Sequence, residues 1–363
     1  MSSYDSLAKN VLSSTLSVQS GDDVIVETWD HGLPIADAFI FHLRKLGAHP
    51  MLLFEHEEAF WKRVECLSDD VLGKVGEHEW AAMEKAKGYV FVPGPANFTK
   101  VWKNFSKFHA AVSYNQEWYE RAKRYRLKAA RITLGYASRE RARGSNISFT
   151  AWQRMLLAAS NIDYDALKDK MTKAAALLRN GQVHITAPNG TDLNLRLAGR
   201  DAYPEDCIID NDDLDHGRNV ANIPGGNLLV CPDENYAEGT IVFDRPTPYM
   251  GKWVNRIRFD FKNGTLRKYQ AGLNENLLRT SYEKATGEKD KVAVLGLGLN
   301  PKARIGFLQD SIVAGAITVA IGGNDDVGGA SKTDFYFPGV ITNATLSVDG
   351  NTIVQKGKVA LNP

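Results

Sequence analysis

Cysteine is scarce in this sequence, and long hydrophobic runs are absent. The three cysteines, Cys66, Cys207 and Cys231, are far apart and show no spacing typical of a metal site. Their low and odd number favours a reducing compartment, so we expect a cytoplasmic protein. No run approaches the ~18 apolar residues of a membrane span, and the first residues lack the basic and apolar blocks of a secretory signal. We therefore expect neither a membrane partner nor export.

An excess of charge of one sign is also missing. The chain has 44 Lys and Arg residues against 43 Asp and Glu residues, a net charge of +1. No overall field attracts nucleic acid, so we expect no nucleic-acid partner. Histidine is absent after His216 in a chain of 363 residues. A transition-metal site in the C-terminal half therefore needs carboxylates, or a histidine from elsewhere.

The length and the hydrophobic pattern predict two domains. Up to about residue 180, short β runs alternate with helical periodicity, which is typical of a layered α/β domain. The predicted strands are 23–28, 50–54, 89–92 and 131–136, and the predicted helices include 34–46, 79–87, 98–108, 150–159 and 164–179.

The pattern changes after Gly181. Turn dipeptides at Asn189-Gly190, Asn263-Gly264 and Asp349-Gly350 separate alternating β runs and predict hairpins, with one clear helix over 275–285. The predicted fold class is α/β. We expect an N-terminal layered α/β domain with bridging helices over 1–180, and a C-terminal, mostly antiparallel β (α+β) domain over 181–363.

Two charged stretches and one cysteine admit functional interpretations. The acidic stretch 206–216 offers five carboxylates, but it lacks the spacing of an EF-hand, so a solvated acidic loop is favoured over a calcium site. The basic run 121–143 contains tyrosines and glutamates, which favours a solvated helix face first and an anion-attracting rim second. Cys231 has no histidine near it in sequence, so we expect a buried thiol and not a nucleophile.

Glycine-rich motifs follow one another in a fixed order along the C-terminal half. They are Gly190-Thr191-Asp192-Leu193, Gly199-Arg200, the run Asn222 to Pro232, Glu238-Gly239-Thr240, the runs 295–301 and 315–322, Gly328-Gly329, and Asp349-Gly350. This order resembles the aminopeptidase T / aminopeptidase S (PepS) metallopeptidase family and its relative, the iron-dependent 2,5-dihydroxypyridine dioxygenase. The resemblance implies an aminopeptidase T-like two-domain fold, a homodimer, and a site in a C-terminal cavity where two metal ions activate water.

The same resemblance implies that this chain lacks the family's metal ligands. Family members carry glutamate where this chain has Asn227 and Val294, and histidine where it has Thr318. Their final His-x-Asp falls around 334–338, where only Asp334 is able to coordinate, and their tyrosine falls near Asp325. We therefore predict no metal ligand and no cofactor.

The intact turns around these replaced positions predict a polar cavity for a small molecule or peptide. The predicted substrate-binding residues are Asn227, Thr318, Asn324, Asp325, Asp334 and Tyr336. Two alternatives stay open at this point. One is an active aminopeptidase or hydrolase with a relocated metal site, built from Asp325, Asp326, Asp334 and His216. The other is a non-catalytic dimeric interaction protein. A ring-cleaving dioxygenase requires the same missing ligands as the peptidase.

Overall fold

The computed structural model describes residues 4–361, which form two compact units. Unit 1 contains residues up to 164 and the segment 207–225, and unit 2 contains 165–206 and the residues from 226 onward. The sequence predicts a single boundary near residue 180, whereas the structure divides after Tyr164 and returns one later segment to unit 1. The reason is a strand in that segment, which extends the sheet of unit 1.

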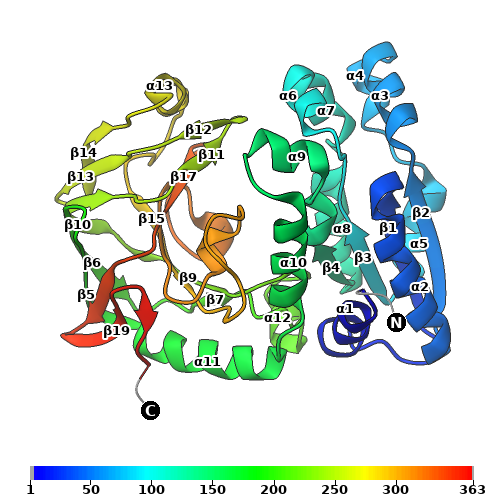
Figure 1. The fold of residues 1–363 in the computed structure, drawn as a ribbon, viewed down its shortest axis with the longest axis horizontal. Helices are drawn as coiled ribbons and strands as arrows, with labels where there is room; N and C mark the ends of the chain where they lie inside the picture. Colours follow the sequence, from blue (N-terminus) through cyan, green and yellow to red (C-terminus); the bar gives the residue numbers. More distant parts are fainter. Residues whose placement is uncertain (1–3, 362–363) are drawn as a thin grey trace. The chain divides into compact units, whose positions relative to one another are not determined.

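Unit 1 is built on a five-stranded parallel sheet (Figure 1). Its strands lie in the order β2-β1-β3-β4-β8. Their bounds are β1 Asp23–Trp29, β2 His49–Glu55, β3 Gly88–Val92, β4 Lys128–Ile132 and β8 Val220–Ile223. Parallel strands need crossover connections, and helices supply them here.

The helices of unit 1 largely follow the predicted pattern. They are α1 Asp5–Asn10, α2 Leu33–Leu46, α3 Glu57–Cys66, α4 Asp69–Leu72, α5 Glu77–Lys85, α6 Phe98–Lys103, α7 Phe105–Ala111, α8 Asn115–Tyr125, α9 Arg139–Gly144, α10 Phe149–Ser160 and α12 Asn211–Asp215. Helix α2 has Pro34 in its first turn and ends at Gly47, whose φ of 80° is the left-handed conformation that glycine favours.

Three local predictions in unit 1 need correction. The predicted strand 131–136 is β4 followed by a 3₁₀ turn, Thr133–Tyr136. The predicted helix 98–108 is two helices, because the backbone leaves the helical conformation at Asn104. The acidic loop contains the short helix α12, where Asp210 and Asp213 form a capping box.

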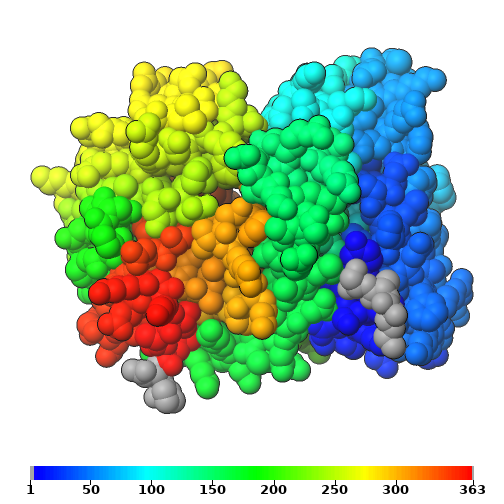
Figure 2. All heavy atoms as spheres, in the orientation of Figure 1, coloured from blue at the N-terminus to red at the C-terminus, as the bar shows by residue number. Residues whose placement is uncertain are grey.

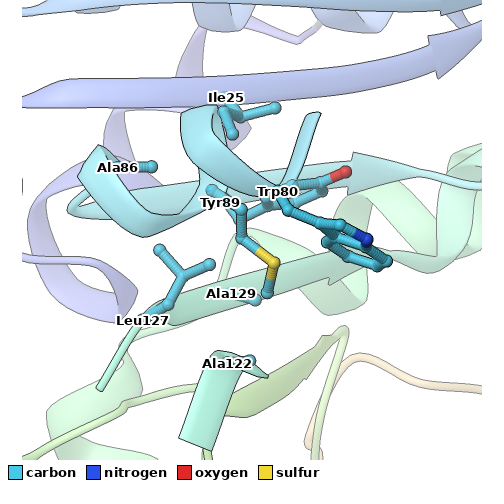
Figure 3. Close-up of a cluster of buried hydrophobic side chains, with 8 residues drawn as sticks. Ile25, Trp80, Ala86, Tyr89, Ala122, Leu127 and Ala129 are labelled. Carbon is cyan, nitrogen blue, oxygen red and sulfur yellow. The ribbon is translucent and has the colours of Figure 1, made fainter. Parts of the chain in front are cut away.

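The core of unit 1 on one face of the sheet is a cluster that α5 and α8 cover. Because side chains alternate along a strand, Ile25, Tyr89 and Ala129 project from the same face of three neighbouring strands. They pack with Trp80 of α5 and Ala122 of α8, and all five are buried (Figure 3).

Unit 2 is mostly antiparallel β structure (Figure 1). An eight-stranded sheet contains, in order, β14 Thr265–Gln270, β13 Arg258–Lys262, β10 Pro232–Val242, β6 Thr191–Ala198, β5 Asn180–Ala187, β18 Thr345–Val348, β19 Asn351–Gln355 and β20 Lys358–Val359. A five-stranded sheet contains, in order, β17 Tyr336–Ile341, β16 Ile317–Gly322, β15 Val292–Gly298, β9 Asn227–Val230 and β7 Tyr203–Pro204. A small hairpin pairs β11 Thr247–Tyr249 with β12 Lys252–Val254.

The predicted hairpins of unit 2 are confirmed. Gly190, Gly264 and Gly350 have φ values of 95°, 69° and 82° at the turns of β5–β6, β13–β14 and β18–β19. The unit also contains α11 Tyr164–Leu177, whose first residue belongs to unit 1, and α13 Glu275–Lys284. Helix α13 lies on the surface and buries only Leu278 (Figure 2, yellow). The predicted α/β fold class is therefore confirmed.

Within residues 4–361, no helix combines the length and the apolar character that crossing a membrane requires.

Candidate functional site

The five-stranded sheet of unit 2 brings two of the predicted cavity residues together. Asn227 begins β9 and Thr318 lies near the start of β16, with β15 between the two strands. Gly296 of β15 is opposite Thr318, and Gly298 is opposite Asn227. Residues two apart in a strand share a face. Asn227 and Thr318 therefore project from the same face of the sheet.

Gly296 packs closely against these two side chains. A Cβ atom at residue 296 would lie 3.0 Å from the Oδ1 atom of Asn227 and 3.0 Å from the Cβ atom of Thr318. These distances are tighter than ordinary contacts, so a side chain here would push its neighbours apart. A glycine inside a strand often marks a place where another group approaches closely.

Two buried polar atoms beside Gly296 have no hydrogen-bond partner among the described residues. Asn227 and Thr318 are 6% and 4% exposed, and within residues 4–361 the Asn227 Oδ1 and Thr318 Oγ1 atoms make no hydrogen bond. Burying such an atom without a partner costs about 1–3 kcal/mol. Native proteins keep few such atoms, so a pair of them on one face of a sheet is unusual.

Val294, where the family resemblance places a glutamate ligand, lies in an apolar environment. It is 1% exposed and forms a cluster with Ala293 and Ala320, against which Leu229 and Val327 pack. A divalent cation requires carboxylate or imidazole ligands in place of these groups. The valine, the amide of residue 227 and the hydroxyl of residue 318 do not fit a two-metal centre.

Asn324, also predicted to line the cavity, is buried, and both the nitrogen and the oxygen of its amide form hydrogen bonds within the protein. It is 0% exposed, and its Nδ2 atom donates to the carbonyl oxygen of Ala293 at 2.9 Å and to the Oε1 atom of Glu234 at 3.0 Å. Its Oδ1 atom accepts from the backbone N–H of Ser331 at 2.8 Å. The structure therefore places Asn324 in a buried network and does not turn its amide toward Asn227 and Thr318.

Glu234 is the centre of that network. Arg200 donates two hydrogen bonds to its carboxylate, at 2.5 and 2.7 Å, and the backbone N–H of Ala330 donates a third at 2.8 Å. Burial alone would raise the pKa of Glu234. The bonds from Arg200, Ala330 and Asn324 outweigh burial and lower the pKa from 4.5 to about 2. The carboxylate is therefore ionised at neutral pH and is a poor general base.

The other two predicted acidic residues lie at the surface. Asp325 is in the 3₁₀ turn Asp325–Val327 and is exposed. Asp334 is exposed and accepts a hydrogen bond from the backbone N–H of Thr286 at 3.2 Å. Within residues 4–361, neither carboxylate forms a hydrogen bond with Asn227 or Thr318.

Tyr336 shares the face of the sheet with Thr318, but lies farther along the strands. It is opposite Gly322, and Thr318 is opposite Val340, so the two side chains are four positions apart on one face. Its ring is 45% exposed. Burial of the hydroxyl, followed by the charges of Asp326 and Glu205, raises its pKa to about 12. The hydroxyl is therefore protonated and able to donate a hydrogen bond at neutral pH.

The interpretation of Cys231 as a buried thiol is confirmed. Its side chain is 4% exposed and its Sγ atom donates to the carbonyl oxygen of Val327 at 3.4 Å. Burial raises the pKa of Cys231 to about 11, although the nearby Arg200 opposes the shift. The thiolate that nucleophilic catalysis requires is therefore scarce at neutral pH.

Sequence reasoning missed Arg200 and Glu234 as a pair. Gly199-Arg200 forms part of the motif series, and Glu234 follows Cys231-Pro232 closely, yet nothing local connects the two residues. Strands β6 and β10 pair, with Leu197 opposite Pro232, and this pairing brings the two side chains together.

One group of three acidic side chains within the described residues is close enough to hold a cation. It is formed by Asp210, Asp212 and Asp213 of unit 1. Asp210 and Asp213 already cap α12, and Arg218 pairs with Asp212 and Asp213 at 2.5 and 2.7 Å. These internal bonds explain the cluster without a metal ion.

Replacing Thr318 by valine is expected to stabilise the protein by about 1 kcal/mol. The substitution keeps the shape of the side chain and removes a buried hydroxyl that has no partner. Thr191→Val is the matched control, since Thr191 is 3% exposed and its Oγ1 atom both donates to and accepts from the backbone of Val242. We expect this control to lose about 1–2 kcal/mol. Urea unfolding measures both. A loss of stability in Thr318→Val equal to that of the control would contradict the unpaired hydroxyl.

Structural comparison agrees with the fold described above. Wild-type AmpT from Thermus thermophilus matches with a TM-score of 0.72 and 17% identity, over 99% of both chains. The 2,5-dihydroxypyridine dioxygenase from Pseudomonas putida KT2440 matches with a TM-score of 0.61 and 16% identity, over 99% of this chain and 98% of the other. At these identities the two structures establish the fold alone.

Sequence comparison gives the family. A curated relative, the 2,5-dihydroxypyridine 5,6-dioxygenase of Pseudomonas putida, is 25% identical over 209 residues, or 53% of this chain. The matched region spans 58% of that relative's length. Residues 2–290 match the thermophilic metalloprotease family M29, and the family resemblance predicted from the motif order is thereby confirmed. The chain belongs to peptidase family M29.

Proposed function

We propose that this chain is a divergent M29 protein that lacks the two-metal peptidase centre and binds a small molecule or peptide at Asn227 and Thr318. The unpartnered Oδ1 and Oγ1 atoms on either side of Gly296 are the observation that carries the proposal. They lie where the family resemblance expects a glutamate and a histidine. The family match also ends at residue 290, before Val294, Thr318 and Asp334.

The chemistry of the two side chains favours binding over hydrolysis. An amide oxygen accepts a hydrogen bond, and a hydroxyl both donates and accepts, so the pair suits an amide or amine group of a ligand. Hydrolysis requires a general base or an activated nucleophile. Arg200 holds the buried carboxylate of Glu234 at a pKa of about 2, and the pKa of the Cys231 thiol is about 11.

Two measurements test this proposal. The first is elemental analysis of the purified protein, where we expect less than about 0.1 divalent ion per chain, together with no turnover of aminoacyl anilides in the presence of cobalt, zinc or manganese. The second is calorimetric titration with a panel of amino acid amides and dipeptides. We expect at least one of these probes to bind, and the Asn227→Ala and Thr318→Val variants to bind it about tenfold more weakly, a loss of about 1.4 kcal/mol.

The Thr191→Val variant is the control for binding, because its hydroxyl is equally buried but bonded within the protein. A stoichiometric, tightly held metal ion with metal-dependent hydrolysis would establish an active aminopeptidase with a relocated site. If no probe binds, and the Asn227→Ala and Thr318→Val variants do not differ from the wild type in any binding assay, the interpretation of a non-catalytic interaction protein replaces the proposal.

A further inference from the structure

Unit 1 contains a cavity that lies apart from every residue discussed as the candidate site. Its volume is about 430 Å³, including the part that opens to solvent. The residues that line it are Glu27, Tyr89, Phe91, Tyr114, Asn115, Trp118, Tyr119, Ala129, Ala130, Arg131 and Val220. All of them belong to unit 1.

Part of the cavity wall lies beside the switch point of the parallel sheet, and most of the rest comes from α8, β4 and β8. The strand order β2-β1-β3-β4-β8 reverses direction between β1 and β3, which makes this pair the switch point of the sheet. Glu27 of β1 and Phe91 of β3 are paired in register, and both lie in the carboxyl-terminal halves of their strands. Crevices at the carboxyl ends of strands beside a switch point are the usual ligand sites of such sheets.

Arg131 supplies a cation without a counter-ion in the cavity. Its Nη2 atom donates to the hydroxyl of Tyr119 at 2.5 Å, and its guanidinium lies 6.0 Å from the ring centre of Phe91. Its buried Nε atom has no partner, and within residues 4–361 it forms no ion pair with a carboxylate. A guanidinium presents its donors in a planar fork that matches a carboxylate, so an arginine with an unpaired Nε donor favours a carboxylate ligand.

Aromatic rings form much of the cavity wall. Phe91 lies between Glu27 and Arg131 in the register of the sheet, and Trp118 and Tyr119 come from the N-terminal half of α8. Trp118 meets the ring of Tyr89 edge to face at 5.2 Å. Flat apolar walls of this kind favour a planar ring. The N-terminal turns of α8 also contribute the positive end of the helix dipole.

Glu27 is the carboxyl group of the cavity wall, and its strand, β1, is separated from the strand of Arg131 by β3. Glu27 accepts a hydrogen bond from the hydroxyl of Tyr89, the labelled core residue of Figure 3. Burial raises the pKa of Glu27 to about 7, against the effect of the Tyr89 bond, and so favours its neutral form more than in an ordinary glutamate. Glu27 and Arg131 lie two strand spacings apart, about 9–10 Å. A small anion at Arg131 is therefore not strongly repelled by Glu27.

We propose that this cavity binds a small aromatic carboxylate, whose acid group pairs with Arg131 and whose ring lies against Phe91 and Trp118. Arg131 belongs to the basic run 121–143. In this proposal it binds an anion, whereas the sequence favours a solvated charge. The inference concerns unit 1 alone, and it holds whether or not Asn227 and Thr318 of unit 2 bind a ligand.

The test uses the full chain and three probes of nearly equal size: benzoate, benzamide and benzylamine. Calorimetry and ligand-observed NMR measure their dissociation constants. We expect benzoate to bind with a dissociation constant of about 1 mM or less, and at least tenfold more tightly than the other two probes. The Arg131→Met variant is expected to bind benzoate at least tenfold more weakly. The Arg143→Met variant, which changes an exposed arginine of unit 1, is expected to bind it like the wild type.

Three results would overturn this proposal. They are equal binding of benzamide or benzylamine, undiminished binding to Arg131→Met, and no binding of benzoate up to about 10 mM. If Arg131→Met fails to fold, the selectivity of the wild type for benzoate over benzamide decides the question. The Thr318→Val variant separates this site from the one in unit 2, since it is expected to leave benzoate binding unchanged.

Discussion

Replacing Glu234 by glutamine is expected to lower the free energy of unfolding by about 3 kcal/mol at pH 7. Glu234 is 6% exposed, and the substitution removes the negative charge that Arg200 contacts at 2.5 and 2.7 Å. A glutamine oxygen still accepts the bonds from Asn324 and Ala330, but its amide nitrogen replaces Oε2 and faces the Nη2 donor of Arg200. The loss therefore combines the missing charge with one missing hydrogen bond. Removing one partner of a buried ion pair typically costs about 3–5 kcal/mol, because the other charge stays buried.

The same substitution is expected to change the dependence of stability on pH. The pKa of Glu234 is about 2 in the folded protein and near 4.5 in the unfolded chain. The stabilisation is therefore fully present above pH 4.5 and is lost as the pH falls toward 2, by about 3 kcal/mol in total. Subtracting the unfolding free energies of Glu234→Gln from those of the wild type isolates this effect, since all other groups titrate in both proteins.

The neighbouring Asp233 provides the matched control. It pairs with Arg196 in the same way along β10, but Arg196 is 47% exposed in its side chain, whereas Arg200 is 27% exposed. We expect Asp233→Asn to cost less than about 1 kcal/mol, because an exposed ion pair contributes little. Equal effects of the two substitutions in denaturant unfolding would show that the Glu234 charge is not specially stabilised.

Replacing Val294 by glutamate is expected to destabilise the protein by about 4 kcal/mol or more at pH 7. The substitution restores the ligand type that the family resemblance expects, but it places a carboxyl group among Ala293, Ala320 and Leu229. Burial of this kind raises the pKa of a carboxyl by up to several units when no cation is near. Urea unfolding followed by circular dichroism measures the loss.

The pH dependence of Val294→Glu runs opposite to that of Glu234. Because burial raises the folded pKa above the ordinary value of about 4.3, the penalty is smallest below that pH and grows as the pH rises. Val294→Gln, which has the same size without the charge, is expected to cost about 2–3 kcal/mol at every pH. If zinc, cobalt or manganese restored the stability of Val294→Glu, further ligands for a metal would exist around residue 294, and the apolar account of this environment would be wrong.

Much of the fold follows from patterns that are local in the sequence. The hairpins at Gly190, Gly264 and Gly350 are predictable because a tight turn requires a left-handed conformation that few other residues adopt. The helix over 34–46 is predictable from a proline in its first turn and a glycine at its end. The break at Asn104 and the strand that ends at Ile132 were missed, because apolar residues continue past both points.

The sequence by itself determined the family, the α/β fold class, and the presence of Asn227, Val294 and Thr318 where the family resemblance expects metal ligands. These are properties of residues and their order. Only the tertiary structure decided that Asn227 and Thr318 both lie beside Gly296 on one face of a sheet, that Arg200 holds Glu234, and that Glu27 and Arg131 share a cavity. The physical reason is strand pairing: register across a sheet joins residues that are tens of positions apart, and no local pattern encodes it.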